Sequence, residues 1–574
     1  MSKPTTAVAQ PPGGPSRPIP ETGAAAIARV IADAGYDMMF GLPGGKAGLI
    51  SDEIGRQGRV HFVLVRHEQN ATIMADTYGR LTGRPGVALA QGVFMASNGA
   101  IGIMGAMMSS VPMLVLTDSS DPPGFAMQPV MQNGTGNYGS IDLPQIFRGM
   151  TKYFAYAATP KEAVQGTQLG LRHAVLGRPG PSVVLARADA LLGTLEDTSA
   201  PFIRPTATYL DRPVSWADAE AVAVAARAVA AARRPAIVAG NGVHVARAHD
   251  ELQRLAHLLG APVGTSSKGL SAMSAEDELY LGLMGIFGRP DTHRAFAEAD
   301  AVIVVGSKLT NSTTNDHSKA IIDPERQLLV QIDIEPRNAG WALPVHHALV
   351  GDAAAALRQL HAALEDELAG ERREPWFVPS PSDEAAPVDD GPLLTPRRIV
   401  DVLNETLPAD TIVTLDAGKN ELFTMHGYRP RTAGSLIEPG EGIAPMGWAA
   451  PAAVAAKLVM PSRPCLAIAG DGGFAMTTHA LATAVQEGAA PIILVMNDSA
   501  FMWYREENGD FPYSAELSQV DFVSIARGYG ADGVRVEDAA GVAKAVGVAL
   551  QSKKPFVIDV VTDREASVYD ILKA

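Results

Sequence analysis

Cysteine and long apolar segments are almost absent from this chain. Its 574 residues include one cysteine, Cys465, so no framework of internal disulfides can form. No segment reaches the ~20 apolar residues that span a bilayer, and the alanine-rich runs at 221–232 and 449–459 predict packed helices instead. Residues 1–20 are polar and proline-rich, without the apolar centre of a signal peptide. We therefore expect a disordered tail over residues 1–20 and a soluble, cytoplasmic protein with no membrane partner.

Positive charge is also scarce. The chain has 47 lysines and arginines against 62 aspartates and glutamates, which gives a net charge of −15. This balance argues against a broad nucleic-acid-binding surface. The 13 histidines show no zinc-binding spacing with the lone cysteine. Because 47% of the residues are hydrophobic and 19% are charged, the composition is that of an ordinary globular protein.

Strand-like apolar runs alternate with helical patterns along the chain, which is typical of parallel α/β units. Three such blocks are expected, over residues 21–190, 214–365 and 393–574. A linker over 366–392, rich in proline and acidic residues, separates the last two. The expected strands lie at 38–40, 61–65, 87–90, 113–117, 236–239, 301–305, 328–332, 412–415, 465–469, 492–496 and 556–560. The predicted fold class is α/β.

The sharpest motif follows the expected strand 465–469. It reads Gly470-Asp471-Gly472-Gly473, and the next apolar run ends in Asn497-Asp498, 27 positions after Asp471. Neighbouring parallel strands end at one edge of a sheet, so both carboxylates can converge there on a hard cation. The two glycines leave backbone N–H groups open to a phosphate at a helix start. A lone Gly-Asp-Gly is more often a surface turn; the Asn-Asp at this distance favours a magnesium–diphosphate site.

These residues resemble the thiamine diphosphate signature, which begins with Gly-Asp-Gly and ends in Asn-Asn at about this distance. The resemblance implies thiamine diphosphate and Mg²⁺ as cofactors, with three metal ligands: Asp471, Asp498 and the carbonyl of Ala500. It also implies that Gly472 and Gly473 contact the cofactor. Aspartate stands at position 498 where the family usually has asparagine. Either side chain offers an oxygen, so metal binding is expected to survive with one extra negative charge.

A carboxylate is also needed at the pyrimidine ring of that cofactor, where it shares a proton with ring N1′. The segment Val63–Glu68 ends an expected strand and resembles the family's strand-end glutamate. The resemblance therefore assigns the catalytic role to Glu68. The alternative is an ordinary glutamate at a helix start, where the helix dipole favours a negative charge.

Further segments resemble the same family. Residues 41–44 (Gly-Leu-Pro-Gly) resemble its first strand and loop, and residues 444–448 (Ala-Pro-Met-Gly-Trp) resemble the segment that bends the cofactor. The resemblance implies that Met446 wedges between the two rings, an effect on orientation, and that the carbonyl of Ala444 accepts from the 4′-amino group. Met446 as a plain core residue is the alternative.

The segment 416–420 (Asp-Ala-Gly-Lys-Asn) resembles the second loop on the diphosphate side, which implies cofactor contacts from Gly418 and Asn420. Asn420 stands where the family often has histidine. The matches cover nearly the whole folded chain and resemble the superfamily of acetolactate synthases, 2-oxo acid decarboxylases and benzaldehyde lyases. The resemblance implies three doubly wound parallel-sheet domains: pyrimidine-binding, middle Rossmann-like and diphosphate-binding. It also implies at least a homodimer, often a homotetramer, in which two chains share each cofactor.

Two segments depart from the family. Gln91–Met95 replaces the Gly-Pro-Gly loop of acetolactate synthases, and a bulky run follows the metal motif where the family's helix start faces the substrate. We interpret these side chains as an apolar substrate pocket lined by Val93, Phe94, Met95, Phe501, Met502 and Arg505. Arg505 is either a partner for a substrate carboxylate or a solvated arginine.

The middle block contains Gly240-Asn241-Gly242-Val243, which lacks the third glycine of a dinucleotide fingerprint. Family members bind FAD, ADP or nothing at this place. The sequence leaves the question open, with no nucleotide as the default because the motif does not support FAD or ADP. The predicted function is a carbon–carbon lyase or carboligase that acts on a small molecule, a 2-oxo acid or a 2-hydroxy carbonyl compound. The alternatives are an FAD-containing thiamine-dependent 2-oxo acid oxidase and a non-catalytic relative.

Overall fold

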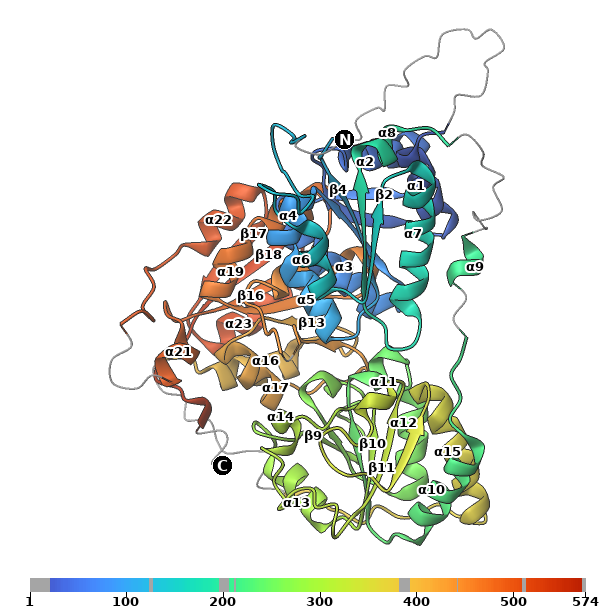
Figure 1. The fold of residues 1–574 in the computed structure, drawn as a ribbon. Coiled ribbons are helices and arrows are strands. Elements are labelled where there is room, and N and C mark those ends of the chain that lie inside the picture. The colour runs from blue at the N-terminus through green and yellow to red at the C-terminus, as the bar shows by residue number, and fades with distance from the viewer. Residues whose placement is uncertain are drawn as a thin grey trace.

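The structure is a computed structural model that describes residues 21–122, 127–195, 206–210, 213–380, 393–440, 442–507 and 513–569. Within these ranges three six-stranded sheets follow one another along the chain, and every strand pair in them is parallel. The predicted tail at 1–20 and residues 381–392 of the linker lie outside the described ranges. Figure 1 shows the first block at the top, the third beside it and the middle block below both.

The first sheet has the strand order β2-β1-β3-β4-β6-β5. Its strands are β1 (Met38–Leu42), β2 (His61–Leu64), β3 (Gly86–Ala90), β4 (Met113–Ser119), β5 (Tyr153–Ala157) and β6 (Pro181–Arg187). Its helices are α1 (Gly23–Asp33), α2 (Gly48–Gln57), α3 (Glu68–Thr82), α4 (Gly92–Ser97), α5 (Ala100–Met108), α6 (Leu143–Met150), α7 (Pro160–Val175) and α8 (Ala188–Leu192), and α9 (Ala207–Leu210) leads onward. All of these strands are parallel, and the order in which successive strands are added to the sheet reverses between β1 and β3, which creates the kind of crevice where α/β folds bind ligands.

The middle sheet has the order β12-β11-β10-β7-β8-β9. Its strands are β7 (Pro235–Ala239), β8 (Val263–Thr265), β9 (Tyr280–Leu283), β10 (Ala301–Val305), β11 (Leu328–Asp333) and β12 (His347–Val350). The helices are α10 (Ala219–Ala231), α11 (Asn241–Val245), α12 (His249–Leu259), α13 (Pro290–Glu298), α14 (Asn311–Thr314) and α15 (Ala353–Glu367). Alternate residues of β7 join two separate apolar cores, Ile237 in one and Val238 in the other. Both faces of this sheet are therefore covered, as a doubly wound fold requires.

The third sheet has the order β14-β13-β15-β16-β18-β17. Its strands are β13 (Ile412–Leu415), β14 (Leu436–Ile437), β15 (Cys465–Gly470), β16 (Ile492–Asn497), β17 (Asp532–Val536) and β18 (Phe556–Val561). The helices are α16 (Pro396–Thr406), α17 (Lys419–Gly427), α18 (Ala449–Val459), α19 (Asp471–Thr477), α20 (Ala480–Glu487), α21 (Met502–Glu507), α22 (Phe522–Tyr529) and α23 (Ala539–Gln551). Leu466 and Ala467 of β15 join different cores, so this sheet too is covered on both faces.

The predicted α/β class is confirmed, and each expected strand is present within two residues of its predicted ends. The alanine-rich runs are helices α10 and α18, as predicted. The sequence did not predict β5, β6, β8, β9, β12, β14 and β17. Most of these are short strands at or next to a sheet edge, where two to five residues with partial exposure give no periodic apolar signal.

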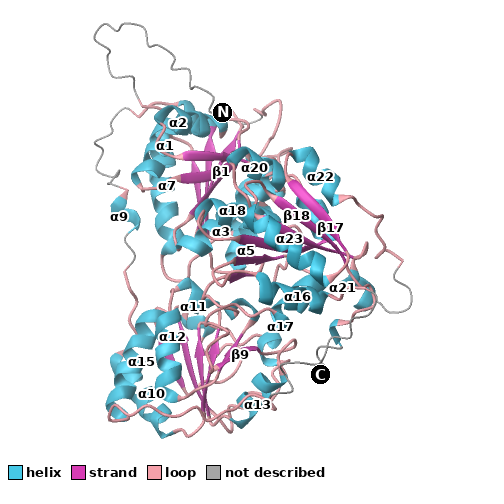
Figure 2. Ribbon diagram, turned by 180° about the vertical axis from the view of Figure 1, so that it is seen from behind, coloured by secondary structure: helices cyan, strands magenta, loops and turns pink. Residues whose placement is uncertain are grey.

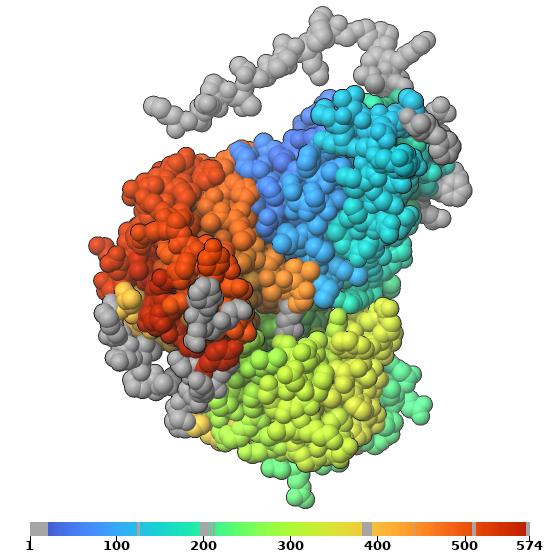
Figure 3. All heavy atoms as spheres, turned by 60° about the vertical axis from the view of Figure 1, so that its left-hand side comes forward, coloured from blue at the N-terminus to red at the C-terminus, as the bar shows by residue number. Residues whose placement is uncertain are grey.

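The first and third blocks pack on each other through α3 and α18, which lie together in the centre of Figure 2. The space-filling view in Figure 3 shows the two blocks meeting along a continuous seam above the middle block. The described half of the linker is pinned to the middle block, because Trp376 donates a hydrogen bond to the carbonyl of Pro235 at 2.7 Å. In the part of the chain that the structure describes, none of the helices has the length and apolar character needed to cross a membrane.

Candidate active site

The carboxylates of Asp471 and Asp498 follow two neighbouring strands. Gly470 at the end of β15 pairs with Met496 of β16, so both aspartates stand on one edge of the sheet. Burial raises the pKa of Asp471 to about 6. Burial, and then the negative charge of Asp471, raise the pKa of Asp498 to about 7. These two neighbouring carboxyls suit a divalent cation. Its positive charge would stabilise the ionised forms that burial and mutual repulsion disfavour.

The turn after β16 folds against the same two carboxylates. The amide of Gly472 donates to Asp471 at 2.7 Å, and the amide of Ala500 donates to Asp498 at 3.2 Å. Ser499 between them has a left-handed backbone, with φ of 57°. Over the described ranges no cluster of three or more histidine, cysteine, aspartate or glutamate side chains could hold a metal. The predicted ligand set has two such side chains and one backbone carbonyl, so it would not form such a cluster.

The two glycines after Asp471 are required by close contacts. A Cβ on Gly473 would lie 2.0 Å from a carboxylate oxygen of Asp416, and one on Gly472 would lie 2.4 Å from the ring of Phe501 and 3.3 Å from the methyl group of Met446. No larger residue fits at either position. The start of α19 therefore packs closely against its surroundings, and the structure brings Met446 and Phe501 to this turn.

Asp416 holds the segment that is predicted to bend the cofactor. Its buried carboxylate accepts hydrogen bonds from the amides of Gly447, Trp448 and Ala449 at 2.9, 2.6 and 3.1 Å. Burial raises the pKa of Asp416 to about 6, and the three amides oppose that rise. Ala444, at the start of the segment, has a φ of 40°, a strained conformation for a residue other than glycine. The sequence placed Asp416 in this loop without predicting its role, although its position directly after β13 was a usable signal.

The loop at Gly418 lies against the same turn. Gly418 has a φ of 130°, and the Asn420 side chain donates to the carbonyl of Asp416 at 2.7 Å while its oxygen faces Gly470. Lys419 was not predicted. Its side chain is only 7% exposed, pairs with Glu506 at 3.4 Å, and acts to lower the pKa of Asp498. A buried cation therefore lies near the extra negative charge that aspartate brings to position 498.

Glu68 is the first residue of α3 and is 6% exposed. The amide nitrogen of Asn98 donates to its Oε2 at 2.9 Å. The adjacent residues face the third block of the same chain: the ring of His67 lies 5.4 Å from that of His479, and the amide of Gln69 lies next to Gly447. We call the sheet edge that carries Asp471 and Asp498 the carboxylate edge. Within the described ranges no hydrogen bond joins Glu68 to either of these aspartates. The glutamate and that edge are therefore not brought into direct contact within one chain.

The predicted substrate residues divide into several environments. Met95 is fully buried in the core of the first block, because residues 92–97 form the short helix α4 and Met95 lies on its inner face. The role of Met95 in lining the substrate pocket stays a prediction. Val93 packs on the same core, whereas the ring of Phe94 is 40% exposed. Met502 is buried at the start of α21.

Arg505 is engaged within the chain. Its guanidinium lies 3.3 Å from Glu565 and 3.9 Å from Glu516, and its side chain is 28% exposed. Neither alternative from the sequence describes this arginine fully, because it is neither solvated nor free of carboxylate partners. A substrate carboxylate would have to compete with two glutamates for it.

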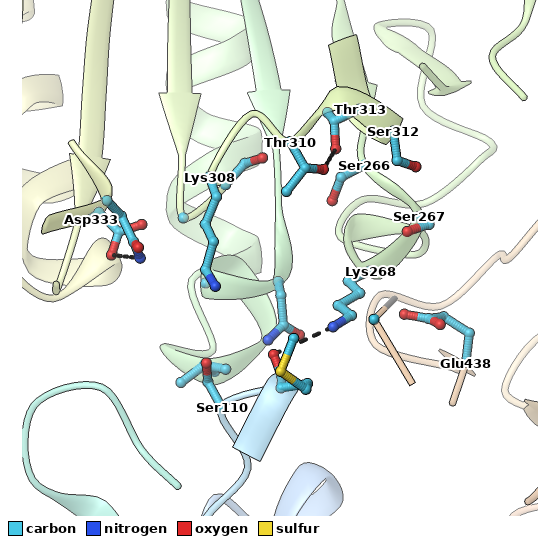
Figure 4. Close-up of a pocket in the computed structure, with 18 of the residues that line it drawn as sticks. Ser110, Ser266, Ser267, Lys268, Lys308, Thr310, Ser312, Thr313, Asp333 and Glu438 are labelled. Atoms are coloured by element: carbon cyan, nitrogen blue, oxygen red, sulfur yellow. Dashed lines mark hydrogen bonds between the residues drawn. The ribbon is translucent and has the colours of Figure 1, made fainter. Parts of the chain in front are cut away.

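A cavity of about 530 Å³ opens at the carboxyl ends of β7, β10 and β11, between the middle block and its two neighbours. Figure 4 shows Lys268 and Lys308 extending toward the same space from two loops of the middle block. Burial, and then the charge of Arg178, lower the pKa of Lys308. A Cβ on Gly242 would lie 2.5 Å from Gly306, so these strand-end turns pack backbone to backbone. The arrangement suits an anionic ligand at a sheet edge.

Comparison with known proteins assigns the family. Three family domains match in chain order: the N-terminal TPP binding domain of thiamine pyrophosphate enzymes over residues 21–133, the central domain over 222–360 and the C-terminal TPP binding domain over 416–560. The chain belongs to the thiamine pyrophosphate enzymes. The resemblance drawn from the Gly-Asp-Gly motif is thereby confirmed at the level of the family. The carboxylate edge lies within the third matched domain and Glu68 within the first.

Several similar proteins are acetolactate synthases. The acetolactate synthase large subunit of Corynebacterium glutamicum is 29% identical over an alignment that covers all of this chain and 92% of the relative. The probable acetolactate synthase large subunit of Methanocaldococcus jannaschii is also 29% identical, with 94% and 92% coverage. The isozyme 3 large subunit of Escherichia coli is 28% identical, with 96% coverage of both chains. The similarity therefore extends over whole chains.

Proposed function

We propose that this thiamine diphosphate enzyme requires Mg²⁺ and cleaves or forms a carbon–carbon bond, with a 2-oxo acid such as pyruvate as donor. The observation that carries the proposal is the pair of buried carboxylates, Asp471 and Asp498, on one edge of the sheet beside the close-packed glycines Gly472 and Gly473. The whole-chain similarity to acetolactate synthases supports the reaction class. It also favours a lyase or carboligase over the alternative of an FAD-containing oxidase.

The donor set fits the cofactor that the family implies. Asp471, Asp498 and the carbonyl of Ala500 would hold Mg²⁺, and Gly418, Asn420 and the amides of α19 would contact the diphosphate. Ala444 and Met446 would hold the rings, with Asp416 fixing their segment through three amides. The thiazolium of the bound cofactor supplies an electron sink for the cleaved bond. Glu68 would hold the proton at pyrimidine N1′.

The direct test is turnover. The purified protein, incubated with thiamine diphosphate, Mg²⁺ and pyruvate, is expected to release CO₂ and to form acetolactate or another carboligation product. Benzoylformate and acyloins serve as second and third substrate classes. Retention of cofactor without conversion of any of these compounds would favour the non-catalytic alternative.

We also propose that two chains share each cofactor, in a homodimer that can pair further into a tetramer. An exposed apolar surface on the first block supports this, because such side chains normally pack against something. Its described members are Phe94, Val130, Met131, Tyr138, Ile141 and Ile146, with Val130 and Tyr138 almost wholly exposed.

Complementation of two inactive variants tests the shared site. Glu68→Gln and Asp471→Ala are each expected to be inactive alone. If one chain supplies the glutamate and the other the metal site, a hybrid dimer keeps one intact site of two. Random re-association of equal amounts should then restore about a quarter of the parent activity. No recovery, despite hybrid formation verified with two affinity tags, would place both residues in one chain's site.

A nucleotide such as FAD or ADP in the cavity of the middle block is a further part of the proposal. Its lining combines the cations Arg178, Lys268 and Lys308 with the carboxylates of Asp333, Asp352, Glu421 and Glu438. The size of the cavity and its three cations support a diphosphate-bearing ligand. Protein purified without added nucleotide and then denatured is expected to release about one equivalent, detected by chromatography and by flavin absorbance. Bleaching of a bound flavin by substrate would support the oxidase alternative. A protein that is purified without nucleotide and binds neither FAD nor ADP would contradict the proposal.

A further inference from the structure

Asn98 makes a contact that the family resemblance did not assign. It follows α4 directly, just after the segment 91–95 that replaces the Gly-Pro-Gly loop, and its side-chain nitrogen donates to Oε2 of Glu68 at 2.9 Å. Thirty residues of chain separate the two side chains. In the part of the chain that the structure describes, this is the hydrogen bond that the side-chain amide of Asn98 makes. The side chain therefore serves Glu68 rather than the local turn.

The fold holds Asn98 rigidly. At the start of α4 the amide of Gly92 donates to the carboxylate of Asp118 at 3.2 Å. At its end the backbone N–H of Asn98 donates to the carbonyl of Phe94. A Cβ on Gly99 would lie 2.6 Å from the sulfur of Met95, so the buried Met95 packs directly beneath this turn. Met95 therefore supports the turn that carries the residue in contact with Glu68.

Asn98 and Glu68 also belong to one packed unit. Helix α5, which starts two residues after Asn98, packs along α3, which starts at Glu68. A Cβ on Gly102 would lie 2.4 Å from the hydroxyl of Thr72, so the backbone of α5 packs directly on the Thr72 side chain of α3. The distance between the amide and the carboxylate is thus fixed by helix packing and not by a flexible loop.

An amide nitrogen only donates, so the oxygen that it contacts is an acceptor and carries no proton. The proton of a Glu68 carboxyl then belongs on the other oxygen, Oε1. We propose that Asn98 is a positioning residue that orients the Glu68 carboxyl and directs its proton to Oε1, the oxygen that would contact pyrimidine N1′ of the bound cofactor. This inference rests on the proposed function of Glu68. It adds a reason for the departure at 91–95: the bulky residues build a helix whose end carries the orienting amide.

The test uses hydrogen–deuterium exchange at C2 of bound thiamine diphosphate, measured by quenching and NMR. In Asn98→Ala the rate is expected to fall about ten- to a hundredfold, as when other groups that orient a reacting side chain are removed. Cofactor affinity should change less than about threefold, because the metal end is untouched. The pH profile of exchange should also move to higher pH, since the ionised carboxylate loses a donor.

Two further variants keep the result decisive. Asn98→Asp preserves shape and should slow exchange at least as much, because a second carboxylate repels the first. Ser97→Ala removes the neighbouring exposed hydroxyl, which bonds the carbonyl of Val93, and should exchange like the parent. Parental rates and pH profile in both Asn98 variants would overturn the inference. Absence of exchange in the parent itself would instead contradict the proposed function, so the two failures are distinguishable.

Discussion

Glu68→Gln is expected to lower the rate of C2 exchange in bound thiamine diphosphate by about 10²- to 10⁴-fold, the range that general acid–base groups contribute. Glutamine keeps the size of the side chain, and its carbonyl can still accept from Asn98, so the start of α3 should remain intact. It cannot, however, share a proton with ring N1′. The loss should therefore appear in exchange and turnover, and cofactor binding should stay largely unchanged.

The measurement compares exchange rates and cofactor affinity in parent and variant. Glu405→Gln is a matched control, because Glu405 lies on α16 with a side chain that is 66% exposed. That control should exchange and turn over like the parent. Equal exchange rates in parent and Glu68→Gln would refute the catalytic role and leave Glu68 as an ordinary helix-start glutamate.

Asp471→Ala is expected to abolish metal-dependent retention of the cofactor. One of two carboxylates at the edge of the sheet is removed, and a metal ion that bridges protein and diphosphate loses a charged ligand. We expect the affinity for thiamine diphosphate in the presence of Mg²⁺ to fall at least ~100-fold, beyond the ~10- to 100-fold cost of losing a residue that only supports a ligand. Asp471→Asn keeps an oxygen that can bind the metal, so its affinity for thiamine diphosphate should lie between those of the parent and Asp471→Ala.

Retention is measured as the thiamine content after gel filtration, with and without a chelator. The parent should keep its cofactor in Mg²⁺ and lose it in chelator, and the variant should lose it in both. Asp410→Asn, which changes an exposed aspartate in the loop before β13, should behave like the parent. Thiamine content that is unaffected by chelator in the parent, or by the substitution in the variant, would count against the metal site.

Much of the carboxylate edge was predictable from the sequence. Asp471 and Asp498 each follow a buried strand, and consecutive strands of a parallel sheet end on one side. That rule needs only the order of elements along the chain. Most strands with continuous apolar runs were found from those runs, although β6, with seven residues, was missed. Short strands such as β14, with two residues, gave no pattern to detect.

Contacts between distant segments were not predictable in this way. The bond from Asn98 to Glu68 depends on how α5 packs against α3, and the position of Lys419 beside Asp498 depends on the approach of two loops. Met95 shows the same limit. Its segment was interpreted as a pocket wall because the side chains are large, and the sequence did not predict that the helix they form turns Met95 inward.

The order of strands and polar residues along the chain determined the α/β class, the sheet edge where two aspartates meet, and the family. These features depend on local sequence patterns and on the rule that consecutive parallel strands end on one side of the sheet. Tertiary packing alone decided which side chains support those groups: Asn98 at Glu68, Asp416 beneath the Ala444–Trp448 segment, and Lys419 near the carboxylate pair. The physical reason is that hydrogen bonds and buried ion pairs depend on distances of a few ångströms between segments far apart in sequence, which are fixed only when the cores close.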